Sequence, residues 1–257
     1  QATHDYRAET HQFVLDVLTD VRKRFAVDGN RVFLCGHGMG GDAVFDIGYS
    51  HPDLFAGLVP LGGVSEKQCQ HLWQNAAGLP MYIVGGELDR DTRERNAREL
   101  DRFLADGKRF DVIYCEFRGA GFGPFHDELL KLFAWMQART RRPLPTEFSI
   151  DVMRSSDRRA WWLSWMGLPP KVVDSQMGTL QIQGTASQGN TIRVQCRTSR
   201  VAIWLSPAMI NFEKRVTVKL NQTQKWNDFV QPDPGALLED LRLRGDVSQP
   251  AWAVLEF

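Results

Sequence analysis

The stretch that decides the fold reads Arg31-Val32-Phe33-Leu34-Cys35-Gly36-His37-Gly38-Met39-Gly40-Gly41. Its apolar run at residues 32–35 predicts a short buried strand. The glycines that follow permit a sharp turn of the backbone. Val44 and Ile47 then recur at helical spacing, up to a stop at His51-Pro52. The stretch therefore predicts a strand, a tight turn and a helix.

The same order of apolar strand, glycine turn and helix is predicted along the first half of the chain. Apolar runs at residues 57–61, 81–84 and 111–115 each lead into glycines, and helical patterns at 92–105 and 128–138 lie between or after them. An amphipathic helix at residues 14–25 precedes the whole series. Short apolar strands that alternate with helices predict an α/β fold with a parallel β-sheet and flanking helices. Ligands of such sheets bind beyond the carboxyl ends of the strands, where these glycines lie.

The pattern changes after the charged and proline-broken stretch at residues 139–145. Alternating strands are predicted at residues 148–153, 160–165, 179–183, 191–196, 201–205, 216–220 and 252–257. Only residues 237–243 indicate a helix. We therefore predict two domains, an α/β domain at residues 1–142 and a C-terminal antiparallel β-sandwich-like domain at residues 143–257.

Composition narrows the functional classes. The 257 residues contain 31 Lys and Arg against 31 Asp and Glu, which argues against binding to a nucleic-acid backbone. No apolar run approaches the roughly 18 residues of a membrane span. The 4 cysteines follow no metal-binding spacing and are expected to be free thiols, and no cofactor is expected. The compartment stays open, because the chain begins at Gln1 without an initiator methionine and is expected to be truncated or processed.

With Val27-Asp28-Gly29-Asn30 before it and His51-Pro52-Asp53-Leu54-Phe55-Ala56-Gly57-Leu58-Val59-Pro60 after it, the opening stretch resembles the elbow region of bacterial α/β-hydrolases. These relatives are serine esterases, depolymerases and acyl-peptide hydrolases, so some are peptidases. The resemblance covers residues 1–142. It implies that the first four strands of the fold and a second oxyanion donor lie upstream of Gln1, so that the domain here is partial.

The resemblance also implies a nucleophile elbow, G-x-S-x-G, and it aligns Gly38 with the serine. Glycine keeps the turn but offers no oxygen, so covalent catalysis is expected to be lost. The alternative is that the alignment is fortuitous. The backbone N–H of Met39 remains able to bind an anion, as one half of an oxyanion hole.

The other two members of a catalytic triad are sought after later strands. Asp89 stands where relatives carry the acid, with Glu87 beside it; the alternative is an acid that caps the following helix. Relatives read G-x-G-H at the base, whereas this chain has Phe122 in place of the histidine. His126 follows four residues later, either as a displaced base or as part of a helix N-terminus.

Further polar residues flank the elbow. His37 precedes Gly38, and Asp42 and Asp46 are spaced i, i+4 on the next helix, so these residues are candidates to line a cleft. A metal site built from His37, Asp42 and Asp89 follows no recognised ligand spacing, and packing and helix-start electrostatics explain the three residues adequately.

In the second half, the sequence Trp161-Trp162-Leu163-Ser164-Trp165 is predicted to form one strand. Strand alternation places Trp161 and Trp165 on the core face and Trp162 on the opposite face. Trp162 is therefore the candidate for stacking on a sugar, with burial in the sandwich as the alternative.

Three hypotheses follow. The first is a hydrolase-related pseudoenzyme that binds a peptide, acyl or glycan ligand, because both Gly38 and Phe122 depart from the triad. The second is an active hydrolase in which His126 or His37 activates water and Asp89 orients the histidine. The third is an assembly module in which another protein chain covers the edge of the strand at residues 32–35.

Overall fold

The computed structural model describes the chain except residues 1–3, 6–7, 143, 170–171, 173–177 and 188, and the side chains of residues 8–10. The chain divides into two compact units, residues 1–11 with 30–142, and residues 12–29 with 143–257. No helix among the described residues combines the length and the apolar character that a membrane crossing requires.

This division differs from our prediction at residues 12–29, which we had assigned to the first domain. They comprise most of helix α1 (Ala8–Arg24) and the loop after it. These residues contact the last helix and the loop after it: Arg22 Nη1 donates a hydrogen bond to the carbonyl oxygen of Arg244, 3.4 Å away, and Gly29 lies against the side chain of Asp246. The break in the interdomain stretch falls at residue 143, which lies outside the described residues.

The first unit is built on a parallel four-stranded sheet in the order β1-β2-β3-β4. Every strand predicted for this half is present, with bounds shifted by at most two residues. The strands are β1 (Phe33–His37), β2 (Gly57–Leu61), β3 (Met81–Gly86) and β4 (Val112–Phe117). The helices are η1 (Gly29–Arg31), α2 (Met39–Ser50), α3 (Cys69–Leu72), η2 (Trp73–Ala76), α4 (Arg90–Ala105), η3 (His126–Glu128) and α5 (Leu129–Gln137).

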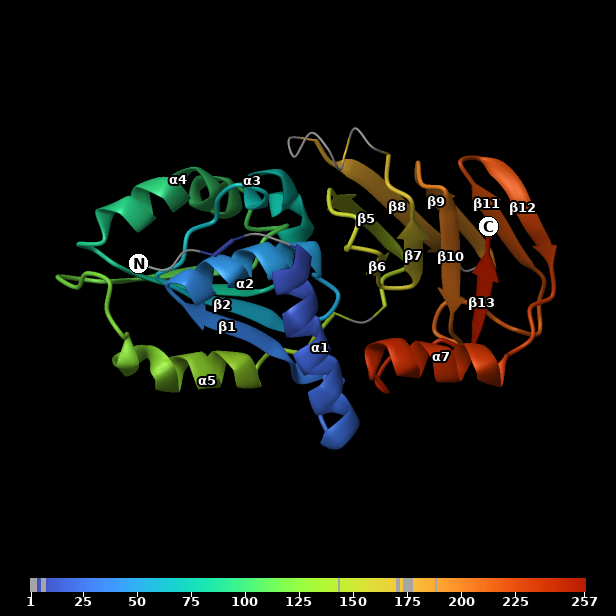
Figure 1. Ribbon diagram of the computed structural model, residues 1–257, viewed down its shortest axis with the longest axis horizontal. Coiled ribbons are helices and arrows are strands. Elements are labelled where there is room, and N and C mark those ends of the chain that lie inside the picture. The colour runs from blue at the N-terminus through green and yellow to red at the C-terminus, as the bar shows by residue number, and fades with distance from the viewer. Residues whose placement is uncertain (1–3, 6–7, 143, 170–171, 173–177, 188) are drawn as a thin grey trace. The chain divides into compact units, whose positions relative to one another are not determined.

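Helices cover both faces of this sheet, with α5 below it and α2, α3 and α4 above it in Figure 1. Alternation along β2 explains the two layers: Val59 belongs to the cluster that includes Trp135 of α5, whereas the side chain of Leu58 lies against Gly48 of α2. Both Leu58 and Val59 are fully buried. Because the four strands are parallel, their carboxyl ends lie at one edge of the sheet, where the elbow also lies.

Strand β1 lies at the end of this sheet. Among the described residues, β1 pairs with β2 alone. Cys35 on this strand is exposed. The expectation that another chain covers this edge stays a prediction.

The second unit contains two sheets. A five-stranded sheet has the order β12-β11-β9-β8-β5, and a four-stranded sheet has the order β13-β10-β7-β6. The strands are β5 (Glu147–Val152), β6 (Arg159–Ala160), β7 (Leu163–Met166), β8 (Leu180–Ser187), β9 (Thr191–Gln195), β10 (Arg200–Leu205), β11 (Val216–Leu220), β12 (Thr223–Asp228) and β13 (Ala253–Glu256). One apolar core contains the inward side chains of both sheets, which is the arrangement of a β-sandwich.

Two details of this sandwich differ from the prediction. The larger sheet is mixed rather than antiparallel, because β9 and β11 run parallel. Their connection passes through β10 in the other sheet, so the chain returns in its original direction. Strand β12 was not predicted, since its sequence Thr-Gln-Lys-Trp-Asn-Asp carries only one large apolar residue.

The predicted role of Trp162 is wrong. Residues 161–162 form a turn between β6 and β7, with φ +50° at Trp161, so the expected strand alternation is interrupted there. Trp162 is only 1% exposed, and its Nε1 donates to the carbonyl oxygen of Pro145 at 2.8 Å. It is a core residue and is not accessible to a sugar.

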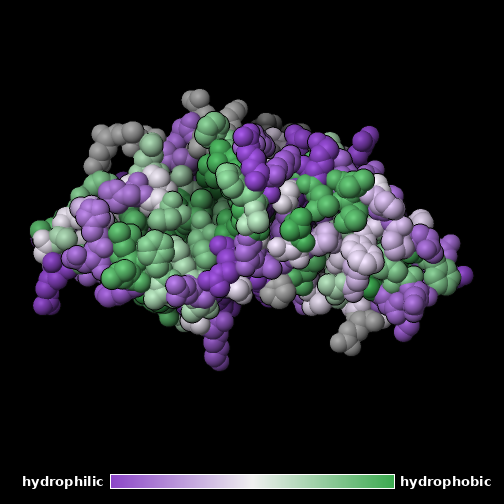
Figure 2. Space-filling view, turned by 90° about the horizontal axis from the view of Figure 1, so that it is seen from below, coloured by the Kyte–Doolittle hydropathy of each residue, from purple (hydrophilic) through white to green (hydrophobic). Residues whose placement is uncertain are grey.

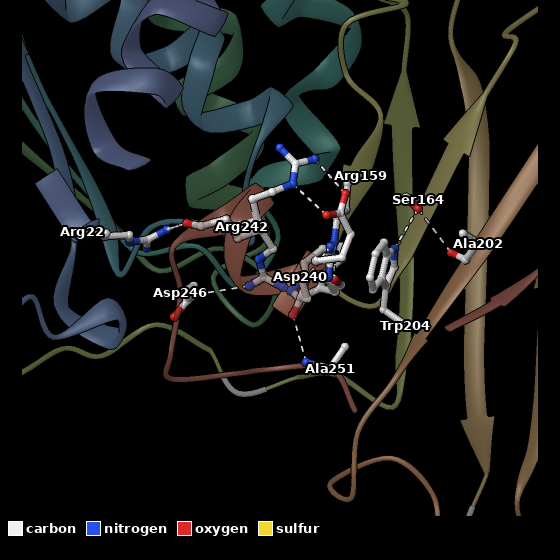
Figure 3. A network of polar contacts seen from close by, with 12 residues as sticks. Arg22, Arg159, Ser164, Ala202, Trp204, Asp240, Arg242, Asp246 and Ala251 are labelled. Atoms are coloured by element: carbon white, nitrogen blue, oxygen red, sulfur yellow. Dashed lines mark hydrogen bonds and ion pairs between the residues drawn. The ribbon is translucent and has the colours of Figure 1, made fainter. Parts of the chain in front are cut away.

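Helix α7 (Pro234–Arg244) is joined to the sandwich through buried charges (Figure 3). Arg159 of β6 contacts Asp240 at 2.7 Å, and Asp240 also accepts the N–H of Ala251 at 2.9 Å. The guanidinium of Arg159 lies 4.5 Å from the ring centre of Trp204, whose Nε1 donates to Ser164 Oγ. Because Asp240 is 1% exposed, its pairing is what makes its burial tolerable.

Candidate functional site: a glycine elbow

The turn from β1 into α2 has the geometry of a strained elbow. Gly38 has φ +57° and ψ −119°, a conformation that residues with a side chain rarely adopt. The turn is so tight that a Cβ at Gly36 would lie 2.2 Å from the carbonyl oxygen of Gly40. The backbone path therefore requires glycine at position 36, and at position 38 glycine avoids the strain of a positive φ.

Phe122 fills the space in which a side chain at position 38 would stand. A Cβ built on Gly38 would lie 2.6 Å from Cζ of this phenylalanine, and one built on Gly62 would lie 3.2 Å from its Cε2. The ring is 47% exposed, so it lies over the elbow at the surface. Phe122, which the resemblance aligns with the base, thus lies directly against Gly38, which the resemblance aligns with the nucleophile.

His37 is the second aromatic neighbour of this ring. Its ring centre lies 4.6 Å from that of Phe122, and its Nε2 lies 2.9 Å from the carbonyl oxygen of Gly123. With a carbonyl as partner, Nε2 is the donor and carries the proton. His37 is exposed and lies beside the elbow, and its hydrogen bond goes to the main chain.

The first turn of α2 contains two of the candidate residues. Met39 begins the helix, where backbone N–H groups have no partner within the helix and the helix dipole favours an anion. Its side chain is 46% exposed. Asp42 Oδ1 accepts the N–H of Val64 at 2.7 Å, and burial raises the pKa of Asp42. Asp42 therefore holds the loop after β2 against α2.

Asp89 lies at a different place on the same sheet edge. It is the residue before α4, but its side chain forms no capping hydrogen bond, so the capping alternative is not observed. It lines a small cleft at the end of β3 together with Thr92, Arg93 and Tyr114. Glu87 accepts the N–H of Gly119 and so ties the loops after β3 and β4 together.

His126 lies at the surface, at the start of η3. In the part of the chain that the structure describes, its side chain makes no hydrogen bond or ion pair, and its carbonyl oxygen accepts the N–H of Leu129. The preceding residue, Phe125, has φ +45° and turns its side chain into the core at 6% exposure. No described hydrogen bond joins His126, Asp89 and the elbow into a relay.

Two further results concern anchoring and metals. Glu128, which sequence reasoning missed, is 1% exposed, accepts a hydrogen bond from Tyr82 and contacts Lys131 Nζ at 3.0 Å. Glu128 fixes the segment after Phe122 to β3. The one sequence signal for this residue was its position at the predicted start of a helix.

Among the described residues, the groups of side chains with metal-binding spacing do not include His37, Asp42 and Asp89 together.

Neither a protein-family description nor any curated protein matches the chain by sequence. Solved structures match it at low identity. A thermostable esterase is 19% identical, with a TM-score of 0.41 over 52% of this chain and 37% of its own length. The esterase PE8 is 19% identical, with a TM-score of 0.43 over 51% of this chain and 61% of its own.

S-formylglutathione hydrolase from Staphylococcus aureus is also 19% identical, with a TM-score of 0.42 over 51% of this chain and 61% of its own. The chain thus spans from 37% to 61% of the length of these three proteins. Each of the three matches covers about half of this chain.

Proposed function

We propose that the first unit is a hydrolase-related domain without catalytic activity, which acts by binding a ligand or a partner at its elbow. The contact between Gly38 and Phe122 carries this proposal. Covalent ester or peptide cleavage needs a nucleophilic oxygen or sulfur and a base within hydrogen-bond reach of it. Here the first position has no side chain and the second has an apolar ring.

The elbow retains features that suit binding. The start of α2 at Met39 offers N–H groups and the positive end of the helix dipole to a carbonyl or carboxylate. His37 and the exposed ring of Phe122 provide an apolar and aromatic wall beside it. An acyl compound or the carboxylate of a peptide fits this chemistry best, and a glycan is the third ligand class that we retain.

The alternative of water activated by histidine has less support. It needs a histidine nitrogen close to a carboxylate at the elbow. His37 instead pairs with a main-chain carbonyl, and His126 has no carboxylate partner among the described residues. We therefore place this activity second to binding.

A test uses p-nitrophenyl butyrate with the purified 257-residue protein. We expect hydrolysis at the rate of buffer, while the amide NMR signals of Gly38 and Met39 shift on addition of the ester. Gly107→Ala, where an added side chain meets nothing within 4 Å, serves as the matched control and should show the same shifts. Steady hydrolysis that His126→Gln or Asp89→Asn abolishes would overturn the proposal. Absence of any shift with acyl compounds, peptides and glycans would remove its binding part.

The open edge of β1 favours assembly as a second candidate function. Exposed strand edges pair readily with other chains. Helix α5 packs beside this strand, since the ring centres of Phe33 and Trp135 are 5.9 Å apart. On the same helix Leu130 is 84% and Phe133 59% exposed, and Figure 2 shows hydrophobic surface on the face of the molecule where α5 lies. An edge strand and an apolar helix side by side form a surface that an added strand and helix would cover.

The assembly function predicts concentration-dependent association that depends on this surface. We expect light scattering to detect oligomers of the wild-type chain, and Leu130→Glu to shift them towards monomer. Leu238→Glu, on α7 of the second unit and 66% exposed in the wild type, is the matched control. A monomer at all concentrations, with slowly exchanging amides along β1, would count against assembly.

A further inference from the structure

Two histidines and an aspartate converge in the interior of the first unit, away from the elbow. His4 Nε2 lies 2.9 Å and His11 Nε2 lies 2.8 Å from the same oxygen, Oδ2 of Asp46. The three residues are 5%, 1% and 0% exposed. Their three ligand atoms all lie within 4.8 Å of one another. The proposed function uses none of these residues.

The position of Asp46 makes this cluster more than a surface contact. It lies on α2 within residues 44–50, all of which are buried, about 10 Å along the helix from Met39. A carboxylate in such surroundings is strongly destabilising unless charged or hydrogen-bonded groups compensate it. His4 and His11 are 42 and 35 residues away in sequence, so the fold itself brings the imidazoles to the carboxylate.

The donor set selects a class of ion. Two imidazole nitrogens and one carboxylate oxygen suit Zn²⁺ and neighbouring divalent transition metals, whereas Ca²⁺ and Mg²⁺ prefer oxygen ligands throughout. Bonds of about 2.0–2.2 Å to a tetrahedral zinc ion place ligand atoms roughly 3.3 Å apart. The nitrogen-to-oxygen distances here are 2.8 and 2.9 Å, so the side chains need to separate by only about half an ångström.

We propose that His4, His11 and Asp46 form a binding site for a divalent transition metal, with Zn²⁺ as the preferred ion and water in the fourth position. The ion would join the start of the chain to the middle of α2. Residues 1–11 belong to the same compact unit as α2, so binding closes a link within one unit. Because folding creates the site, metal binding stabilises the folded state.

The test uses the full 257-residue protein after dialysis against a chelator. Calorimetric titration with ZnCl2 should show one equivalent bound, and CoCl2 should produce the intense visible bands of four-coordinate cobalt. Zn²⁺ should also raise the midpoint of thermal unfolding. Since metal ligands are first deprotonated, the affinity should fall as the pH is lowered towards 5.

Variants separate this site from adventitious binding. His4→Gln and His11→Gln should each weaken zinc binding at least tenfold and remove the cobalt bands, whereas His126→Gln, an exposed histidine elsewhere, should change neither. Circular dichroism verifies that each variant is folded, and His4→Gln keeps the test decisive if His11→Gln does not fold. No zinc bound by the wild type, or binding that neither ligand variant weakens, would overturn the proposal and leave a hydrogen-bonded cluster.

Discussion

Gly38 in the first unit and Trp161 in the second lie in sharp turns after a strand, with φ +57° and +50°. The two turns differ in what surrounds them. At Gly38 the neighbouring ring of Phe122 is 47% exposed. At Trp161 the indole is 9% exposed, and that of Trp162, the next residue, is 1% exposed.

The difference shows two ways to hold a backbone in an unfavourable conformation. Positive φ is strained for a residue with a side chain, at about 1–3 kcal/mol, and persists only where packing fixes it. In the second unit, burial of two indoles provides that packing. In the first unit, glycine removes the strain. Gly38 itself is buried beneath Phe122, whose ring remains about half exposed. An exposed ring at the elbow suits binding, and the buried indoles at the second turn suit structure.

The largest expected effect is at the covered turn. Trp162→Ala should lower the free energy of unfolding by about 3–5 kcal/mol, because it removes a buried indole. It also leaves the carbonyl of Pro145 without its donor. Urea denaturation followed by far-UV circular dichroism measures this loss. Trp252→Ala, at a residue 43% exposed, is the control and should change stability by less than about 1 kcal/mol. Equal losses in the two variants would contradict the assignment of Trp162 to the core.

A second prediction contrasts the indoles of the second unit with a buried acid of the first. Glu99 on α4 is 4% exposed, and burial raises its pKa from 4.5 to about 7. The folded state therefore binds its proton more tightly than the unfolded state does. Stability should fall as the pH rises from about 4.5 to about 7, and the full destabilisation, about 3 kcal/mol, should be present above pH 7.

Glu99→Gln removes this ionisation. At pH 8 it should be more stable than the wild type by about 3 kcal/mol, and at pH 4 the two proteins should be about equal. Urea denaturation at both pH values tests the prediction, with Glu213→Gln, an exposed residue of the second unit, as the control. The same pH dependence in Glu99→Gln as in the wild type would show that another group is responsible.

The elbow itself gives the next effect in size. Gly38→Ser should destabilise the protein by about 1–3 kcal/mol through its positive φ, and should not create esterase activity, because no base is nearby. Gly40→Ser is the matched control, since a side chain there meets nothing within 4 Å. Phe122 is exposed enough to turn aside, so Phe122→Ala should restore less than about 0.5 kcal/mol to Gly38→Ser. If Gly38→Ser were as stable as Gly40→Ser, the strain at the elbow would be disproved.

The first unit was largely predictable because its signals are local. Apolar runs ending in glycine placed β1 to β4 within two residues, and glycine at positions 36 and 38 marked the turn that the backbone requires. The contact of Phe122 with Gly38 was not predictable, because it joins residues from separate loops. The same holds for the cluster of His4, His11 and Asp46, which follows no sequence motif.

In the second unit, the prediction failed where the local sequence pattern and the tertiary packing favour different structures. Trp161 and Trp162 have strong strand propensity and stand within an apolar run, but tertiary burial holds them in a turn. Strand β12 escaped prediction for the opposite reason, because most of its side chains are polar and exposed and its pairing with β11 supplies the stability. Propensity says little about either case, since the decisive contacts are not local.

The smallest expected effect concerns a third turn with positive φ, which contains neither glycine nor a buried indole. Asn221 (φ +48°) and Gln222 (φ +69°) connect β11 and β12 as a two-residue hairpin turn. Asparagine tolerates this conformation, but glutamine does not. Gln222→Gly should therefore stabilise the protein by up to about 1 kcal/mol and raise the thermal midpoint by roughly 2–4 °C. Gln224→Gly, inside β12, should instead destabilise it, because glycine weakens strands. A fall in the midpoint for Gln222→Gly would mean that the contacts of glutamine outweigh the strain, as they do at Trp161.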